Sequence, residues 1–272
     1  MFTNLLPQPH NKTKINFPDK YDISSKYSTV ISLNIRRGSS KQIQEEVIVA
    51  AQQRRSSTVC FANVHMTIEA TRDKEYANIV NGSDWVLADG APIKWAIQAI
   101  HKHKQERITG YSFMQNILLQ SAEDGLSVFF YGGTQEMLSA TISMCNKMYP
   151  SLTVAGVYSP PFRSLTIVEE DEIIERIKLS GAQLIFVALG CPRQEIWINR
   201  MRHQIPAVLL AVGGALPVFA GQFSQAPHWV QLSGFEWLFR LCQEPSRLFR
   251  RYMITNTLFV IYLFRVLFKK RH

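Results

Sequence analysis

Residues 183–214 read QLIFVALGCPRQEIWINRMRHQIPAVLLAVGG. The short apolar runs at 183–190 and 207–214 are typical of buried strands, and the segment 192–201 between them predicts a helix. A strand, a helix and a second strand in this order form a βαβ unit, whose two strands lie parallel in one sheet. This stretch therefore predicts an α/β fold.

The alternation of apolar strands with helices extends over most of the chain. Further strands are predicted at 27–33, 58–64, 85–89, 126–132 and 152–158. Helices are predicted at 40–54, 66–80, 90–101, 135–148 and 166–179. We therefore expect a Rossmann-like, doubly wound and mostly parallel sheet over residues 26–226, preceded by a mobile arm at 1–25.

Candidate ligand-binding residues follow the predicted strands, because ligands in doubly wound folds bind beyond the carboxyl ends of the strands. These residues are Asn63, Asp89, Gly90, Gly132, Gly133, Gly190, Gln194, Gly213 and Gly214. They form neither a GxGxxG fingerprint nor a P-loop, so neither usual nucleotide-binding motif is present. The glycines alone are weak evidence, because tight strand-to-helix turns need glycine in any case.

The net charge is +9 over 272 residues, from 30 Lys and Arg against 21 Asp and Glu. Residues 235–272 carry eight of the cations and two of the acids, and so most of the excess. A basic balance favours a phosphate-bearing partner, which is a nucleic acid, an anionic lipid or a nucleotide. Composition does not choose among these.

The four cysteines form no CxxC pair, and no histidine stands at zinc-ligand spacing from them, so neither a zinc site nor a disulfide framework is expected. The chain also has no DxD motif, and the acidic run 169–172 is explained as a solvated helix start. No metal or cofactor is therefore predicted. The first residues do not have the pattern of a signal peptide, which favours a cytoplasmic setting.

Residues 227–272 form a basic, aromatic C-terminal appendage. Thirteen residues separate Arg251 from Arg265, fewer than the roughly 20 apolar residues that a spanning helix needs. We therefore expect an amphipathic helix that contacts an anionic membrane surface. The alternative is a C-terminal helix that packs on the core.

The stretches that carry a family resemblance are ANVHMTIEATRDKEY (62–76), SDWVLADGAPIKWA (83–96), ERITGYSFM (106–114), VFFYGGTQEM (128–137), LIFVALGCPRQEIWI (184–198), AVGGALPVFAGQFSQAPHWVQ (211–231) and GFEWLFRLCQEPSRLFRRYM (234–253). In this order they resemble the WecG/TagA/CpsF glycosyltransferase family, glycosyltransferase family 26. The resemblance implies a metal-independent, inverting transfer of a sugar from a UDP-sugar to a polyprenyl-diphosphate-linked saccharide. The sugar is of the N-acetylmannosamine or glucose type, and the reaction serves bacterial cell-surface polysaccharide synthesis at the inner face of the cell membrane.

The resemblance also assigns site residues. Asp89 matches the family's proposed base, and Arg107 and Gln194 match active-site positions. Asn63 matches the asparagine at the nucleotide-binding strand end, and His65 is a candidate to face the cleft. The alternatives are a helix N-cap for Asp89, a surface ion pair for Arg107, a helix start for Gln194, a turn for Asn63 and a structural role for His65.

Three arginines of the appendage, Arg240, Arg247 and Arg250, match family positions thought to close over the active site. Their offsets of seven and three residues place them on one face of a single helix. Arginine suits phosphate oxygens, so we expect this face to neutralise the leaving diphosphate. The alternative is a solvated or lipid-facing basic stripe. Arg251 and the later cations are expected to contact lipid headgroups.

Two positions depart from the family pattern. Phe61 stands where members often have Thr, and Pro217 stands in GALPVF, where members more often have an Asp. These departures leave open a non-catalytic, membrane-associated scaffold of the same fold. A nucleic-acid-binding module is a further alternative, but no recognisable motif supports it. The sequence leaves the donor sugar and a homo-oligomeric state open.

Overall fold

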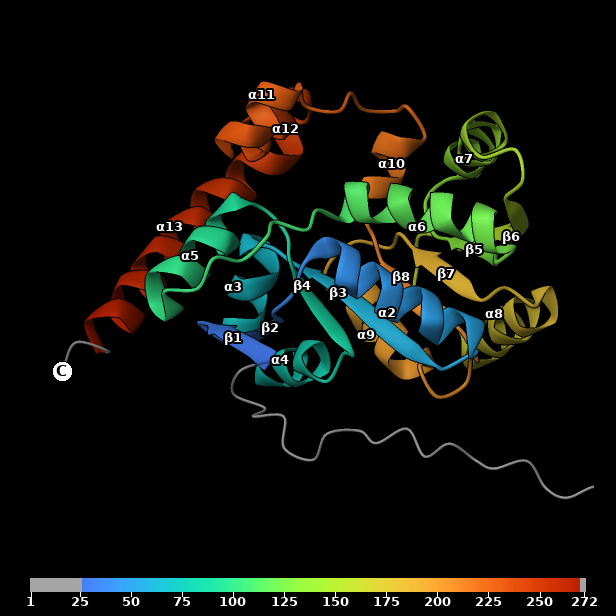
Figure 1. The fold of residues 1–272 in the computed structure, drawn as a ribbon, viewed down its shortest axis with the longest axis horizontal. Helices are drawn as coiled ribbons and strands as arrows, with labels where there is room; N and C mark the ends of the chain where they lie inside the picture. The colour runs from blue at the N-terminus through green and yellow to red at the C-terminus, as the bar shows by residue number, and fades with distance from the viewer. Residues whose placement is uncertain (1–25, 270–272) are drawn as a thin grey trace, which may run out of the picture.

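The computed structural model describes residues 26–269, and Figure 1 shows a parallel sheet enclosed by helices. The strands are β3 (Ser57–Ala62), β4 (Trp85–Ala88), β5 (Ser127–Tyr131), β6 (Thr153–Tyr158), β7 (Leu184–Val187) and β8 (Val208–Ala211). They pair in the order β4-β3-β8-β7-β5-β6, and every pairing is parallel. The predicted Rossmann-like α/β class is therefore confirmed.

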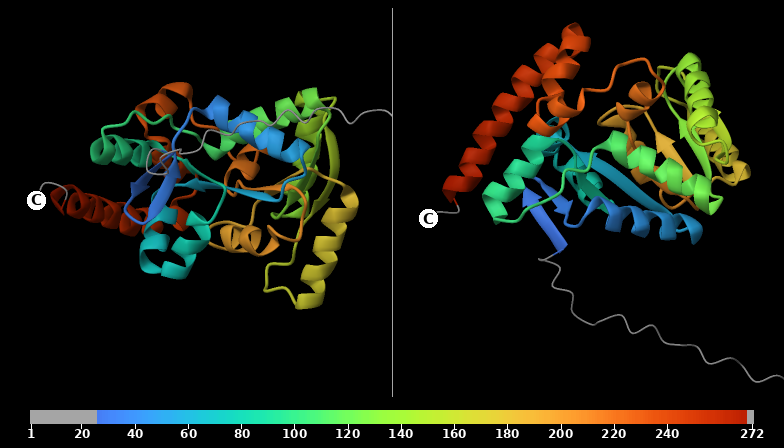
Figure 2. Two further views of the ribbon diagram at one scale, coloured as in Figure 1. Left: turned by 60° about the horizontal axis from the view of Figure 1, so that its bottom comes forward. Right: turned by 45° about the horizontal axis from the view of Figure 1, so that its top comes forward.

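The helices of the core connect these strands and lie on both faces of the sheet (Figures 1 and 2). They are α2 (Ser40–Gln52), α3 (Val64–Arg72), α4 (Lys74–Asn81), α5 (Ala91–His101), α6 (Gly110–Asp124), α7 (Gln135–Met148), α8 (Ile167–Ser180), α9 (Arg193–Met201) and α10 (Ala215–Phe219).

Successive side chains of one strand enter two separate hydrophobic cores. In β3, Cys60 and Ala62 pack with α3, α4, α5 and α9, whereas Val59 and Phe61 pack with α2 and α6. Since both faces are covered, every residue of β3 is buried. This explains why the sequence shows a continuous apolar run in place of an alternating one.

Two local predictions need correction, and one helix was not predicted. Residues 27–33 do not form one strand of the main sheet, because Ile31 has φ 58° and turns the chain between β1 (Tyr27–Val30) and β2 (Leu33–Arg36) of a separate antiparallel hairpin. The helix predicted at 66–80 is two helices, since the Asp73 carboxylate accepts from the backbone N–H groups of residues 75 and 76 and starts α4. Helix α6 was not predicted.

The C-terminal segment, here called the appendage, comprises residues 227–269 of the described chain. It contains α11 (His228–Ser233), α12 (Glu236–Gln243) and α13 (Pro245–Lys269), and α13 runs along α3 and α5 (Figure 1). Leu248, Thr255 and Phe259 of α13 are buried. The predicted arm at 1–25 and the last residues, 270–272, lie outside the described residues.

Helix α13 is longer than the thirteen-residue apolar segment on which the sequence prediction rested, because it begins at Pro245. By length and composition alone, Pro245–Phe268 could cross a membrane, and about a tenth of its most apolar window is buried. Several of its apolar side chains are exposed, among them Phe249, Met253 and Phe264.

Candidate active site

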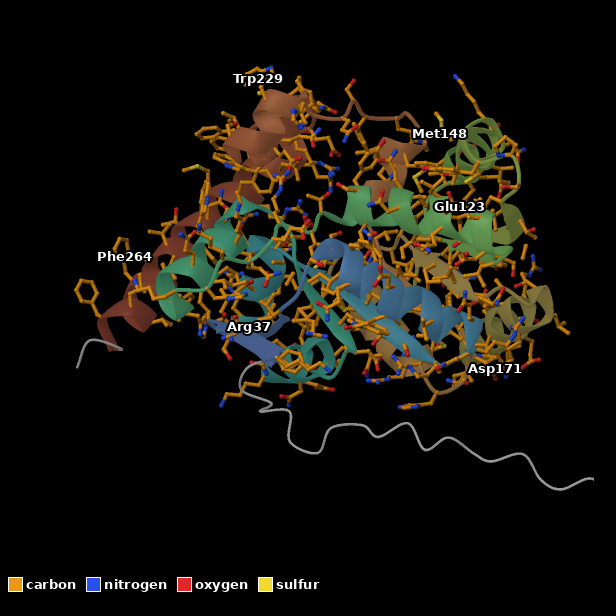
Figure 3. The ribbon with its side chains drawn as sticks, in the orientation of Figure 1. Arg37, Glu123, Met148, Asp171, Trp229 and Phe264 are labelled. Carbon is orange, nitrogen blue, oxygen red and sulfur yellow. The ribbon has the colours of Figure 1, made fainter. Side chains whose placement is uncertain are left out.

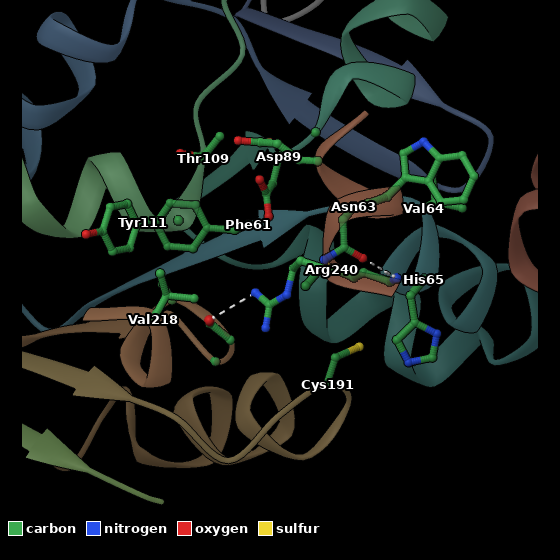
Figure 4. A pocket seen from close by; sticks show the side chains of 18 of the residues that line it. Phe61, Asn63, Val64, His65, Asp89, Thr109, Tyr111, Cys191, Val218 and Arg240 are labelled. Carbon is green, nitrogen blue, oxygen red and sulfur yellow. Dashed lines mark hydrogen bonds between the residues drawn. The ribbon is translucent and has the colours of Figure 1, made fainter. Parts of the chain in front are cut away.

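A pocket of about 360 Å³ lies beyond the carboxyl ends of β3, β4, β7 and β8, with the appendage on its far side. Figure 4 shows that side chains from strand ends and from the appendage face one space. Residues of the core that line it include Phe61, Asn63, His65, Asp89, Gly90, Gly190, Gln194 and Gly213. The appendage contributes Gln231, Glu236, Trp237, Arg240, Arg247, Arg251, Tyr252, Thr255 and Asn256.

Asp89 follows β4 and reaches the pocket because its backbone continues the sheet, with its N–H donating to the carbonyl of Ala62 at 2.9 Å. Burial and the nearby Glu236 carboxylate raise the pKa of Asp89 to about 7. The same pKa is lowered by the charges of Arg107 and Arg240 and by the backbone N–H of Gly110. A carboxyl group with this pKa changes its protonation near neutral pH.

The Asp89 side chain does not cap α5, which was the alternative role predicted for it. Gly90 occupies the N-cap position of α5, and no side chain caps this helix. Gly90 has φ 89°, a conformation that favours glycine. The Asp89 carboxyl group instead faces the pocket and accepts from the backbone N–H of Gly110, the first residue of α6.

Arg107 does not line the pocket but holds the appendage beside it. Its Nη1 donates to the carbonyl of Gln231 at 2.8 Å and to Oε2 of Glu236 at 3.0 Å. Glu236 does line the pocket, and burial raises its pKa while Arg107 and Arg240 lower it. Arg107 therefore acts on Asp89 through its charge and through the placement of Glu236.

Gln194 lies in the pocket wall, but its side-chain amide is already hydrogen-bonded to other groups of the protein. Its Nε2 donates to Glu195 Oε1 at 2.7 Å and to the carbonyl of Ala211 at 3.0 Å, and its Oε1 accepts from the N–H of Gly190 at 3.1 Å. A Cβ on Gly213 would lie 2.8 Å from that Oε1. Gln194 therefore links the ends of β7 and β8 through hydrogen bonds.

Asn63 and His65 begin α3 at the edge of the pocket. The Asn63 Oδ1 accepts from the backbone N–H of Met66 at 3.1 Å, so Asn63 is the N-cap of α3 (Figure 4). His65 lies 3.8 Å from Glu69, and its Nδ1 is buried without a hydrogen-bond partner. Burial and the charge of Arg251 lower the pKa of His65.

The prediction that Arg240, Arg247 and Arg250 share one face of a single helix is wrong. The helix breaks at Glu244, so Arg240 lies on α12 while Arg247 and Arg250 lie on α13. Residues 247, 251 and 255 then share the helix face that lines the pocket. Arg250 is exposed and does not line it, and Arg251 is in its place.

Two of the pocket arginines already have partners. Arg240 donates from Nη1 to the carbonyl of Gly214 at 3.1 Å, which joins α12 to the end of β8 (Figure 4). Arg247 makes a bidentate pair with Glu244 at 2.7 and 2.6 Å. Both groups still line the pocket, so each can turn part of its donor set toward an anion.

The predicted glycines divide into two groups. Gly90, Gly190 and Gly213 line the pocket, but Gly132 and Gly133 after β5 do not. A Cβ on Gly132 would lie 2.6 Å from the carbonyl oxygen of Ala188, so glycine is needed there for a close backbone approach. The structure thus gives Gly132 a role in packing two strand ends, away from the pocket.

The sequence pattern of the Glycosyl transferase WecG/TagA/CpsF family matches residues 28–272. The chain belongs to this family. It is 31% identical to the N-acetylglucosaminyldiphosphoundecaprenol N-acetyl-beta-D-mannosaminyltransferase of Bacillus spizizenii over 196 residues. These residues are 72% of this chain and 74% of that protein. The enzyme of the same name from Bacillus subtilis is 28% identical over 196 residues, which are 72% of this chain and 75% of that protein.

The protein is therefore a glycosyltransferase, and its two departures from the family pattern have structural explanations. Phe61 lines the pocket and packs edge-on against Phe113, with ring centroids 5.5 Å apart. Pro217 lies in the first turn of α10, where a backbone N–H has no partner within the helix, so the ring costs no hydrogen bond there.

Two functional candidates of this glycosyltransferase were missed by sequence reasoning. Glu236 comes from the appendage and lies near Asp89, and Arg251 takes the place predicted for Arg250. The rotation of α13 about its axis decides which arginine faces inward, and the packing of α13 on α3, α5 and α12 fixes that rotation. Between residues 26 and 269, no three His, Cys, Asp or Glu side chains are grouped to hold a metal ion.

Proposed function

We propose that this glycosyltransferase moves a sugar from a UDP-sugar to a polyprenyl-diphosphate-linked saccharide, with inversion and without a metal ion. The observation that carries the proposal is the position of Asp89, which has a pKa of about 7 and faces the pocket that the appendage arginines line. This arrangement places one base and several cations around one substrate-sized space.

Asp89 supplies the base in the proposed step. The acceptor oxygen forms a bond to the anomeric carbon while the bond from that carbon to the β-phosphate oxygen of UDP breaks. The hydroxyl proton passes to the Asp89 carboxylate, and UDP leaves with the electron pair. A base whose pKa lies near the working pH is efficient in such a transfer, because it is deprotonated yet still takes a proton.

Arg240 and Arg247 stabilise the departing diphosphate in this proposal. Their guanidinium groups line the pocket, with Arg240 beside Gly214, and arginine donates in pairs to phosphate oxygens. Positive charge placed where negative charge develops lowers the barrier to transfer. Because Arg240 also holds Gly214, the appendage brings the charge into position as it docks.

The names of the two relatives favour particular substrates. Both are called N-acetyl-beta-D-mannosaminyltransferases that act on N-acetylglucosaminyldiphosphoundecaprenol. We propose a donor of the N-acetylmannosamine type and an acceptor of this lipid-linked kind for the present chain, in cell-surface polysaccharide synthesis. A glucose-type donor is the second candidate that the donor assay must test.

We propose that the appendage contacts the inner face of the cell membrane without crossing it. Figure 3 shows Trp229 and Phe264 pointing away from the protein, and their side chains are 72% and 56% exposed. Arginines 247, 250 and 251 lie in the first two turns of α13, and charged residues are costly inside a bilayer. Exposed aromatic groups beside cations suit the membrane interface.

The test is a transfer assay with purified full-length protein in EDTA. UDP-N-acetylmannosamine and UDP-glucose are supplied separately with N-acetylglucosaminyl-diphosphoundecaprenol, and UDP release and the anomeric configuration of the product are measured. We expect metal-independent transfer with inversion from UDP-N-acetylmannosamine. Retention at the anomeric centre or loss of activity in EDTA contradicts the mechanism, and absence of transfer from both donors favours the scaffold alternative.

A further inference from the structure

Two nitrogen atoms at one end of the pocket are buried and have no hydrogen-bond partner. They are Nε of Arg251 on α13 and Nδ1 of His65 on α3. Both residues line the pocket, and α13 packs directly against α3. Since buried polar nitrogens in folded proteins are nearly always hydrogen-bonded, these two atoms are available to a ligand that enters the pocket.

The charged neighbours leave Arg251 without a counter-ion. Within the part of the chain that the structure describes, Arg251 makes no ion pair, and its guanidinium carbon lies 5.5 Å from the ring centroid of Tyr252. Glu69, which faces His65, pairs with Arg72 at 3.4 Å. Glu195, which lines the pocket, accepts from the Tyr76 hydroxyl and the Gln194 amide. Arg251 thus contributes an uncompensated positive charge to the pocket wall.

The other pocket arginines, unlike Arg251, have hydrogen-bond partners within the protein. Arg247 has both oxygens of Glu244 within hydrogen-bond distance, and Arg240 donates to the carbonyl of Gly214. Arg240 and Gly214 belong to the side of the pocket at the end of β8, whereas His65 belongs to the start of α3. The pocket therefore has a second basic corner, defined here as His65 and Arg251.

We propose that the basic corner of His65 and Arg251 binds the diphosphate of the lipid-linked acceptor. This inference rests on the proposed function, because that reaction brings two diphosphates into one pocket. The proposed function assigns the donor diphosphate to Arg240 and Arg247, which already have protein partners, so the acceptor diphosphate needs a cation of its own. His65 adds a neutral N–H donor, and Arg251 adds the charge.

The position of Arg251 on α13 also suits an acceptor that carries a polyprenyl chain. The same helix exposes Phe249, Met253, Val260 and Phe264, so a chain that leaves the basic corner meets apolar surface on α13. The acceptor sugar separates its diphosphate from its reacting hydroxyl. The acceptor then extends from Asp89, across the pocket, to the appendage.

The test compares two probes by titration calorimetry on the full-length protein: UDP, and farnesyl-diphospho-N-acetylglucosamine added in the presence of saturating UDP. Arg251→Gln is compared with Arg250→Gln, its exposed neighbour on the same helix. We expect Arg251→Gln to weaken binding of the farnesyl probe by about 10- to 100-fold, with UDP affinity changed less than about threefold. Arg250→Gln should change neither affinity.

Two further variants separate binding from folding. Arg251→Lys keeps the charge and should recover part of the lost affinity, while His65→Phe should weaken the farnesyl probe alone. Thermal unfolding of each variant checks that the fold is intact. An equal loss of affinity for UDP in Arg251→Gln overturns the proposal, because Arg251 then belongs to the donor site; an unchanged affinity for both probes overturns it as well.

A lipid headgroup is the competing source of phosphate. Binding to vesicles of phosphatidylglycerol and of phosphatidylcholine is therefore measured for the same variants. If Arg251→Gln weakens binding to the anionic vesicles but not to the farnesyl probe, Arg251 serves the membrane and the proposal is wrong. If the probe binds through Arg251 but no sugar is transferred, the basic corner stands and the proposed function fails.

Discussion

The Arg107 guanidinium lies 3.0 Å from the Glu236 carboxylate and joins the core to the appendage directly beside Asp89. The same Arg107 nitrogen holds the carbonyl of Gln231 at 2.8 Å. Because Glu236 raises the pKa of Asp89 and Arg107 lowers it, this pair links the docking of the appendage to the protonation of the proposed base.

The Arg107–Glu236 pair should contribute measurably to stability, since both side chains are largely shielded, with 19% and 29% exposed. In a double-mutant cycle with Arg107→Ala and Glu236→Ala, we expect a coupling energy of about 0.5–1.5 kcal/mol from urea unfolding. Arg107→Ala should cost more than Glu236→Ala, because it also releases Gln231. Strict additivity of the two single changes would show that the pair is not formed in solution.

Glu236→Gln should shift the pH dependence of transfer. The base must be deprotonated, so kcat/KM is expected to fall as pH drops below about 7, the pKa of Asp89. Removing the Glu236 charge removes one cause that raises this pKa, so the acid limb should move to lower pH. Glu175→Gln, which changes an exposed carboxylate on α8 paired with Lys178, is the control and should leave the limb in place. An unmoved limb in Glu236→Gln refutes the coupling.

Gln194 should prove to be a residue that holds the pocket wall. Gln194→Ala removes the amide bonds to Gly190, Glu195 and Ala211, and we expect it to lower the free energy of unfolding by about 2–3 kcal/mol. Gln194→Glu should also destabilise, because it places an acceptor against the Ala211 carbonyl. Urea unfolding measures both. A variant as stable as the wild type but inactive would assign Gln194 to the substrate instead.

Asp89→Asn should stabilise the protein at alkaline pH. The folded state holds the Asp89 proton up to about pH 7, whereas an unfolded Asp loses it near pH 4, so ionised Asp89 disfavours the fold above pH 7. We expect Asp89→Asn to raise Tm at pH 8 and the gain to shrink as pH falls from 7 toward 4. Asp171→Asn, at an exposed position on α8, is the control. An equal gain at pH 5 would contradict the raised pKa.

The sequence predicts the sheet well because most of its strands are buried on both faces and are therefore continuous apolar runs, as in Leu184–Val187. Helix α6 also has a sequence signal, since Thr109 caps it and residues 113, 114, 117 and 118 are buried on one side. The glycine at its first position, however, resembles a turn. Such local ambiguity is resolved only when the helix packs against α2 and α10.

The proposed base is named from the family resemblance, and its position at the end of the strand predicted at 85–89 indicates that it could face a cleft, where the structure places it. Its surroundings could not be predicted, because Glu236 lies 147 positions further along the chain than Asp89 and meets it only through tertiary packing. The arginine spacing failed for a related reason. Pro245 cannot continue α12, so the chain starts a new helix there and the seven-residue offset from Arg240 to Arg247 does not lie on one helix face. The packing of α13 then turns Arg251 toward the pocket instead of Arg250.

The role of Asp89 as the base is tested most directly by the single-turnover rate of sugar transfer by Asp89→Asn, measured beside the affinity of the same protein for the UDP-sugar. We expect a rate about 100- to 10,000-fold below that of the wild type, because the base is lost, with donor affinity nearly unchanged. A variant that transfers the sugar within a few fold of the wild-type rate would contradict the assignment of Asp89 as the base.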